Sequence, residues 1–190
     1  MQMNLIKNKK ISIFLLTIIF LYLSLSFFVA FFAFSIGDDI YESTPEDLNL
    51  SYEEIDIITS QSSISTWWIP NDSEITIIML HGLRSQKADM EILNKIDEFS
   101  KLGYSIIAVD FRNHGKSGEG VFTFGVDEVT DVFNTIEYYR DKKNLKTFGI
   151  WGFSYGATTA LLTGLEFDKK DFDVEIVGIF AESPYMDLLA

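Results

Sequence analysis

The sequence predicts an α/β fold, in which a mostly parallel sheet with helices on both faces follows one transmembrane helix. Three observations lead to this prediction. The first 36 residues hold a long apolar run and no acidic residue, whereas all 28 acidic residues follow them. Short apolar runs then alternate with amphipathic segments, which is the pattern of strand–helix–strand units. Glycines and polar residues come directly after several of these runs, where a parallel sheet places its ligand-binding edge.

The amino-terminal apolar run covers residues 11–34 and contains no charge, glycine or proline. A helix of that length reaches about 36 Å, which is enough to cross a hydrocarbon core of about 30 Å. We therefore predict a transmembrane signal anchor. A cleaved signal peptide is the alternative, because Ser35-Ile36-Gly37 resembles a cleavage site, and a soluble core helix is the least favoured interpretation.

The flanks of this run predict its orientation. Lys7, Lys9 and Lys10 precede it, and five acidic residues follow it within 38–47. By the positive-inside rule, residues 1–10 form a basic cytoplasmic tail. We expect a single-pass protein of the cell membrane in which the domain that follows this run lies outside the cytoplasm.

Charge and composition bound the rest of the chain. Residues 35–54 are polar and acidic and include Pro45, which predicts an acidic stalk before a domain over 55–190. After residue 36 the chain has 12 basic and 28 acidic residues, which argues against a nucleic-acid partner. The sequence has no cysteine and two histidines 33 residues apart, so no metal site is predicted.

Six apolar runs predict the strands of the domain. They cover residues 55–59, 65–69, 75–80, 104–111, 148–153 and 174–181. The last four lack regular polar alternation and predict strands buried on both sides. Apolar spacing predicts helices over 88–102, 126–139 and 155–165.

The segment Gly152-Phe153-Ser154-Tyr155-Gly156 follows a predicted strand and opens a predicted helix. A G-x-S-x-G sequence in this context presents a serine hydroxyl on a sharp turn, and the glycines leave room for a strained backbone. The amides at the helix start can stabilise an oxyanion. Ser154 is therefore the candidate nucleophile, against the alternative of a merely glycine-rich turn.

The segment His81-Gly82-Leu83 follows the predicted strand 75–80. Gly82 permits a close approach, so the loop can direct a backbone amide at the same oxyanion. We predict an oxyanion hole made by the amides of Leu83 and Tyr155. Gly152, Gly156, His81 and Gly82 would support the turn and the loop, and His81 is interpreted as shaping the loop because it precedes Ser154.

The segment 110–117, DFRNHGKS, begins at the end of the predicted strand 104–111 and combines turn residues with charges. Asp110 and Arg112 are expected to form a local ion pair that holds a tight loop. We interpret this segment as structural and not catalytic, because paired charges in proteins are more often scaffolding.

Taken together and in this order, HG, DFRNHGKS, GFSYGA (152–157) and AESPY (181–185) resemble the α/β-hydrolase fold family. The resemblance is greatest to its membrane-anchored branch of serine-aminopeptidase-like and monoacylglycerol-lipase-like proteins, which WWIP at 67–70 also matches. It covers about residues 55–190. It implies a serine hydrolase that cleaves an ester, thioester or amide through an acyl-enzyme on Ser154, with Leu83 and Tyr155 as oxyanion amides. The expected substrate is a small-molecule, lipid or peptide acyl compound, and no cofactor is implied.

The sequence departs from this family at the catalytic base. The family order is serine, acid and histidine, but both histidines of this chain precede Ser154. Acidic candidates do follow it: Asp168, Asp171, Asp173, Glu182 and Asp187. We favour a fragment truncated before its last strands over a non-catalytic binding protein that kept the fold. Use of His81 or His114 as the base, and a purely structural membrane protein, are the remaining alternatives.

Overall fold

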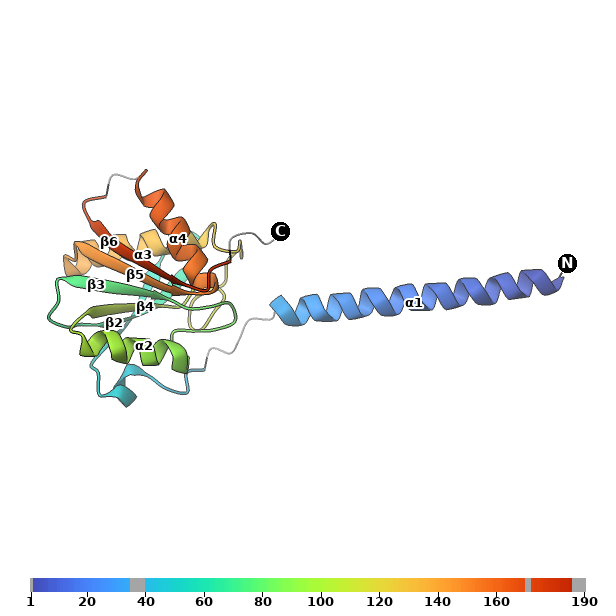
Figure 1. Ribbon diagram of the computed structural model, residues 1–190, viewed down its shortest axis with the longest axis horizontal. Coiled ribbons are helices and arrows are strands. Elements are labelled where there is room, and N and C mark those ends of the chain that lie inside the picture. Colours follow the sequence, from blue (N-terminus) through green and yellow to red (C-terminus); the bar gives the residue numbers. More distant parts are fainter. Residues whose placement is uncertain (1, 35–39, 170–171, 186–190) are drawn as a thin grey trace. The chain divides into compact units, whose positions relative to one another are not determined.

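The computed structural model describes residues 2–34, 40–169 and 172–185. The chain divides into two compact units, Met1–Ile36 and Gly37–Ala190 (Figure 1). The first unit is a helix and the second is a layered α/β domain.

The helix α1 spans Gln2–Phe34 and therefore begins well before the apolar run. Its window Ser12–Ala30 has a mean hydropathy of 2.6 over 19 residues. The helix is long and apolar enough to cross a membrane. A signal sequence near the amino terminus meets the same criteria, so the signal anchor and its orientation stay predictions.

The domain is built on a six-stranded sheet with the order β1-β2-β4-β3-β5-β6. The strands are β1 (Glu53–Ile58), β2 (Ser63–Ile69), β3 (Ile75–Leu80), β4 (Ser105–Val109), β5 (Thr147–Phe153) and β6 (Glu175–Glu182). The pairs β1–β2 and β2–β4 are antiparallel, and β4, β3, β5 and β6 run parallel. The predicted fold class is confirmed.

Helices cover both faces of this sheet (Figure 1). Helix α2 (Met90–Lys101) packs on one face, and α3 (Glu128–Lys143) and α4 (Tyr155–Phe167) pack on the other. A short 3-10 helix, η1 (Pro45–Leu48), lies beside α2. The parallel strands β3, β4 and β5 all end at the edge where the predicted motifs occur.

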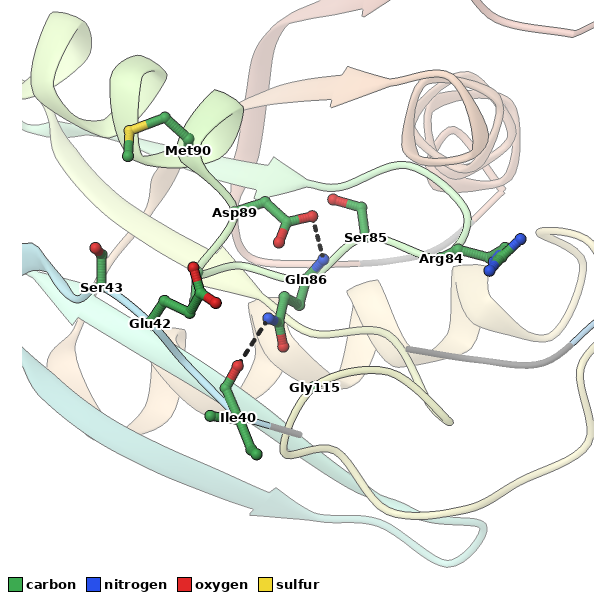
Figure 2. Close-up of a pocket in the computed structure, with 10 residues that line it drawn as sticks. Ile40, Glu42, Ser43, Arg84, Ser85, Gln86, Asp89, Met90 and Gly115 are labelled. Atoms are coloured by element: carbon green, nitrogen blue, oxygen red, sulfur yellow. Dashed lines mark hydrogen bonds between the residues drawn. The ribbon is translucent and has the colours of Figure 1, made fainter. Parts of the chain in front are cut away.

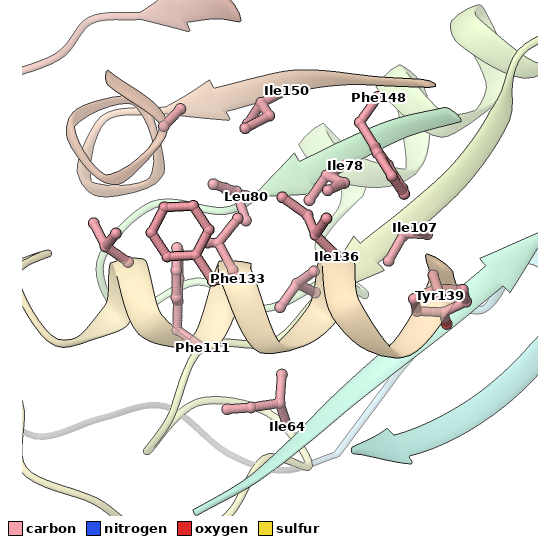
Figure 3. Packing of buried hydrophobic residues seen from close by; sticks show 14 of the residues in the cluster. Ile64, Ile78, Leu80, Ile107, Phe111, Phe133, Ile136, Tyr139, Phe148 and Ile150 are labelled. Carbon is pink, nitrogen blue, oxygen red and sulfur yellow. The ribbon is translucent and has the colours of Figure 1, made fainter. Parts of the chain in front are cut away.

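Alternation along the strands divides the core into two layers. In β3, Ile78 and Leu80 face α3 and α4, whereas Ile77 and Met79 face α2. Figure 3 shows Phe133 and Ile136 of α3 pointing at the first of these layers. Because β3 and β4 are covered on both faces, their backbones and the loops that leave them are firmly placed.

The strand predictions agree closely with the structure, and one expectation about burial is wrong. Every predicted strand is present within two residues at each end, and 75–80 is matched in full. β6 is not buried on both sides, since Val177 is 48% exposed and Phe180 is 62% exposed. In the described part of the chain β6 pairs only with β5. A shallow apolar depression of about 280 Å³ therefore remains between β6 and Phe99 of α2.

The described part of the predicted stalk packs on the domain. Pro45 is buried in η1, and Tyr41, Leu48, Leu50 and Tyr52 contact the layer beneath α2. β1 begins at Glu53, two residues before the predicted domain boundary. The boundaries themselves stay predictions, but from residue 40 onwards this segment belongs to the fold.

Candidate active site

Ser154 is the single residue between β5 and α4. Its backbone has φ 50° and ψ −108°, a conformation that residues other than glycine rarely adopt. Its amide donates to the carbonyl of Glu182 at the end of β6, at 2.8 Å. Strain of this kind costs about 1–3 kcal/mol and persists only where the surroundings impose it.

The first turn of α4 packs directly against the end of β3, and this contact imposes the conformation of Ser154. A Cβ atom on Gly156 would lie 2.1 Å from the carbonyl oxygen of Leu80 and 2.6 Å from that of His81. A Cβ atom on Gly152 would lie 2.3 Å from the carbonyl oxygen of Gly156. These are backbone atoms that cannot move aside, so glycine is required at both positions of the turn.

The Ser154 side chain is partly exposed at this turn. It makes no capping hydrogen bond to α4, and its hydroxyl has no partner among the residues that the structure describes. Tyr155 is the first residue of α4, so its amide has no acceptor within the helix. A partly exposed hydroxyl thus lies beside an unused backbone donor.

The loop after β3 lies next to Ser154. Residues 82–85 form a turn in which the Ser85 amide donates to the Gly82 carbonyl at 3.2 Å. A Cβ atom on Gly82 would lie 3.7 Å from the Cβ of Ser154. Leu83 occupies the first central position of this turn, and its amide donates no hydrogen bond within the described ranges. Because Leu83 is a predicted oxyanion donor, residues 82–85 are called the oxyanion turn.

His81 is fully engaged by backbone groups. Its Nε2 receives the amide of Phe111 at 3.1 Å, and its Nδ1 lies 2.7 Å from the Gly82 carbonyl. An amide can only donate, so Nε2 accepts and the proton is on Nδ1. Burial, and next the nearby His114, lower the pKa of His81 to about 4. His81 is therefore neutral and has no nitrogen free for Ser154.

His114 makes the reciprocal connection between the same two loops. Its Nε2 receives the amide of Arg84 at 3.2 Å, and its Nδ1 donates to the Arg112 carbonyl at 2.9 Å. The two imidazole rings are 5.1 Å apart. Burial lowers the pKa of His114 as well. Each histidine thus joins the loop after β3 to the loop after β4.

Asp110 at the end of β4 pairs with Lys87, and both side chains are completely buried. The Lys87 ammonium donates to Asp110 Oδ2 at 2.8 Å, and the Lys87 amide donates to Oδ1 at 2.7 Å. Burial alone would raise the pKa of Asp110, but the charge of Lys87 and its hydrogen bonds outweigh this and lower it.

The expected ion pair between Asp110 and Arg112 is wrong. Arg112 instead forms a bidentate pair with Asp131 of α3, at 2.7 and 2.8 Å. The chain turns directly after β4 ends at Val109, so strand alternation does not bring Asp110 and Arg112 together. Asp110 therefore pairs with Lys87 in the segment between β3 and α2, and Arg112 pairs with Asp131 in α3.

The acidic candidates that follow Ser154 are separated by the fold. Glu182 ends β6 at the edge of Ser154. Asp173 precedes β6 at the opposite edge and pairs with Lys146, and Asp168 lies at the end of α4. Asp171 and Asp187 lie outside the described residues. Of the described candidates, Glu182 alone is placed near the serine.

Comparison with known proteins places this arrangement in a family. A family model described as the alpha/beta hydrolase fold matches residues 75–171, about half of the chain and the segment that holds the turn, both loops and Ser154. The chain belongs to the alpha/beta hydrolase fold family. The aminopeptidase-like and monoacylglycerol-lipase-like branch stays a prediction.

Individual relatives of this hydrolase domain include an esterase. The structure of the Pyrococcus furiosus esterase Pf2001 superposes with a TM-score of 0.69 at 35% identity, covering 79% of this chain and 58% of that one. The uncharacterized protein YqkD of Bacillus subtilis (strain 168) is 35% identical over 97 residues, 49% of this chain and 30% of that protein.

Ethanol acetyltransferase 1 of Hanseniaspora uvarum is 31% identical over 99 residues, which is 52% of this chain and 28% of that protein. The chain thus spans less than a third of the length of these two curated relatives. The fold and its esterase neighbours support a hydrolase.

The hydrolase domain also contains a cavity of about 420 Å³ beside the oxyanion turn (Figure 2). Its lining comes from three segments: Ile40, Glu42 and Ser43; Arg84, Ser85, Gln86, Ala88, Asp89 and Met90; and Gly115. Gln86 donates from its side chain to the Ile40 carbonyl and from its amide to Asp89. Ser154 is not among its lining residues, so the cavity is separate from the candidate nucleophile.

Two buried groups of this edge have no role in the sequence-based interpretation. Lys87 has no local signal beyond a lysine in a polar loop. Glu128 lies in the first turn of α3, where the helix dipole alone would explain an acidic residue. Its carboxylate in fact accepts hydrogen bonds from Thr123 and Gly125 and holds the loop before that helix. The role of Lys87 depends on Asp110, which is 23 residues away in the sequence, whereas the partners of Glu128 lie three and five residues before it.

We predict that Gly156→Ala prevents folding or lowers the free energy of unfolding by about 3 kcal/mol or more, because its Cβ would overlap two carbonyl oxygens. Urea unfolding followed by tryptophan fluorescence measures this, since all three tryptophans are buried in the domain. Gly178→Ala is the matched control: its Cβ would meet nothing within 4 Å, and we expect a change below about 1 kcal/mol. Equal effects of the two substitutions would contradict the close packing of the turn.

We predict that the free energy of unfolding falls as the pH is lowered below about 6.5. The pKa of His81 is about 4 in the fold and about 6.5 in an unfolded chain. Between these values the unfolded chain binds more protons, so acid favours unfolding. The His81 contribution is complete above about pH 6.5 and is lost towards pH 4, and His114 acts in the same direction.

Unfolding in urea between pH 7 and pH 5 tests this expectation, because carboxyl groups titrate mostly below that interval. His81→Gln replaces the imidazole with an uncharged amide that can still donate and accept hydrogen bonds, and the variant should show a weaker pH dependence. A wild-type free energy that is constant from pH 7 to pH 5 would show that the histidines are not held neutral.

Proposed function

We propose that this protein is a serine hydrolase in which Ser154 attacks an acyl carbonyl and forms an acyl-enzyme. The observation that carries this proposal is the placement of Ser154 at a strained turn, with a partly exposed hydroxyl beside the oxyanion turn. Backbone strain concentrates at functional positions, and here it directs a hydroxyl to the edge of the sheet.

The amides of Leu83 and Tyr155 are proposed to stabilise the oxyanion. The attack converts the carbonyl oxygen into an anion, and backbone donors already in place bind it better than they bind the substrate. Tyr155 supplies the free amide at the start of α4, and Leu83 supplies the one in the turn after β3. Gly152, Gly156, Gly82 and His81 act as the supports that hold these two donors next to Ser154.

The base in this mechanism is neither His81 nor His114. Both nitrogens of each ring are hydrogen-bonded to backbone groups, and burial keeps both rings neutral. A serine needs a base within hydrogen-bond distance to lose its proton. The reaction therefore requires a base other than these two histidines.

The substrate class follows from the chemistry of the nucleophile and from the relatives. A serine with an oxyanion hole transfers acyl groups from esters, thioesters or amides and needs no cofactor. Pf2001 is named as an esterase and the Hanseniaspora uvarum protein as an acetyltransferase, which is the same acyl chemistry. We propose a small-molecule, lipid or peptide acyl substrate.

A non-catalytic binding protein with this fold is the second candidate. The engagement of both histidines favours it, because neither ring has a nitrogen free to activate Ser154. The two candidates differ in whether Ser154 is reactive.

We also propose that residues 11–34 anchor the protein in the cell membrane with the domain outside the cytoplasm. The length and composition of α1 and the lysines that precede its apolar run support this topology.

We predict that a fluorophosphonate probe labels the full-length gene product and that Ser154→Ala abolishes labelling and ester hydrolysis without unfolding the domain. The exposed Ser60 provides the control, and Ser60→Ala should retain both activities. Labelling that survives Ser154→Ala would remove Ser154 as the nucleophile. Absence of labelling in the wild-type protein would favour the non-catalytic candidate.

We predict that an alkaline phosphatase reporter fused after residue 190 is active outside the cytoplasm. A fusion lacking residues 1–36 should leave the reporter inside. An inactive reporter in the first fusion, with a cytoplasmic fluorescent reporter active at the same position, would overturn the proposed topology.

A further inference from the structure

Tyr41 precedes the first strand, yet its hydroxyl lies within the buried pair of Lys87 and Asp110. It donates to Asp110 Oδ2 and accepts a hydrogen bond from the Lys87 ammonium. Burial, and next the charge of Asp110, raise the pKa of Tyr41, so the phenol keeps the proton that it donates. We call Tyr41, Lys87 and Asp110 the triangle below.

The ring of Tyr41 fixes the triangle against the sheet. It contacts Trp67 of β2 edge-on, with centroids 5.2 Å apart. The ammonium groups of Lys87 and Lys116 lie 4.8 and 4.5 Å from the centre of its ring. These cation–π contacts hold two positive charges near the same aromatic ring, and Ser65 of β2 accepts a further hydrogen bond from Lys87 at 2.8 Å.

Asp110 connects the triangle to both loops that approach Ser154. Its carboxylate accepts the amide of Lys87, which lies two residues after the oxyanion turn, and the amide of Lys116 at 3.1 Å. Gly115, the residue before Lys116, has φ 49°, and a Cβ atom on it would lie 2.2 Å from Asp110 Oδ2. The loop after β4 therefore wraps closely around this carboxylate.

The two loops are joined again on the side of the nucleophile. His114 lies two residues before Lys116 and receives the amide of Arg84 in the oxyanion turn. Arg84 has φ 62°, a conformation that residues other than glycine and asparagine seldom adopt. The turn is thus held at Arg84 by His114, and the chain just after it is held at Lys87 by Asp110. We expect a shift of either hydrogen bond to displace the amide of Leu83.

We propose that Tyr41 is a positioning residue for the oxyanion turn, acting through Asp110 and Lys87 from a segment that precedes the sheet. Its catalytic consequence rests on the proposed function. Its geometric consequence does not, because the order of the turn can be measured without turnover.

Tyr52 offers a matched control for Tyr41. Its ring contacts the same Trp67 edge-on, with centroids 5.4 Å apart, but its hydroxyl makes no hydrogen bond in the described part of the chain. A Tyr→Phe change at either position preserves the ring and removes only the hydroxyl. A purely structural contribution of the rings would leave both variants like the wild type.

The first experiment is amide hydrogen exchange on the 190-residue chain in detergent micelles. We expect Y41F to speed exchange at Arg84 and Ser85 by about tenfold, as fits the loss of a hydrogen bond to a charged group. Amides of β5, such as Ile150, should keep their wild-type rates, and Y52F should change neither region. Wild-type exchange at Arg84 and Ser85 in Y41F, or equal acceleration in β5, would overturn the proposal.

The second experiment measures ester hydrolysis by the full-length gene product. We expect Y41F to lower kcat by about tenfold with KM unchanged, because a displaced amide weakens binding of the transition state more than binding of the substrate. Y52F should match the wild type, and a Y41F enzyme with wild-type kcat would overturn the catalytic consequence. If the wild-type protein has no activity that depends on Ser154, the proposed function fails, and hydrogen exchange alone decides the role of Tyr41.

Discussion

The close contact between the first turn of α4 and the end of β3 is the constraint on which the rest of this edge depends. Gly156 lies so near the carbonyls of Leu80 and His81 that no side chain fits between them. The chain must therefore turn at one residue, Ser154, to pass from β5 into α4. The same contact brings the residues after Leu80 next to Ser154. The positions of the serine and of the oxyanion turn therefore depend on the same packing contact.

Around this contact the edge is held by polar groups as much as by apolar packing. Two buried ion pairs, Lys87 with Asp110 and Arg112 with Asp131, fix the loop after β4 to its neighbours. Burying a charge is costly unless it is paired and hydrogen-bonded, so each of these side chains has little freedom to move. The neutral rings of His81 and His114 complete the network by receiving backbone amides.

In the α/β-hydrolase domain, both histidines hold the loop after β3, which carries the predicted oxyanion donor Leu83, to the loop after β4. In the proposed mechanism, preorganisation of the oxyanion donors is therefore separate from activation of Ser154, which needs a further group. β6 also contributes to this edge, because the Ser154 amide donates a hydrogen bond to the carbonyl of Glu182 at the end of that strand.

The sequence by itself determined the strands, the helices and the turn at Ser154, because hydrophobic periodicity and the glycine spacing at 152 and 156 act locally. It also indicated that HG and G-x-S-x-G would meet, since parallel strands end at one edge. Only the tertiary structure decided which charges pair: Asp110 selects Lys87 and not Arg112, and Tyr41 joins them from before the first strand. Phe180 of β6 is likewise exposed in the tertiary structure, although the sequence pattern predicts a strand that is buried on both sides. Partners brought together by folding are distant in the sequence, and burial depends on what covers a strand, so neither can be read from local pattern.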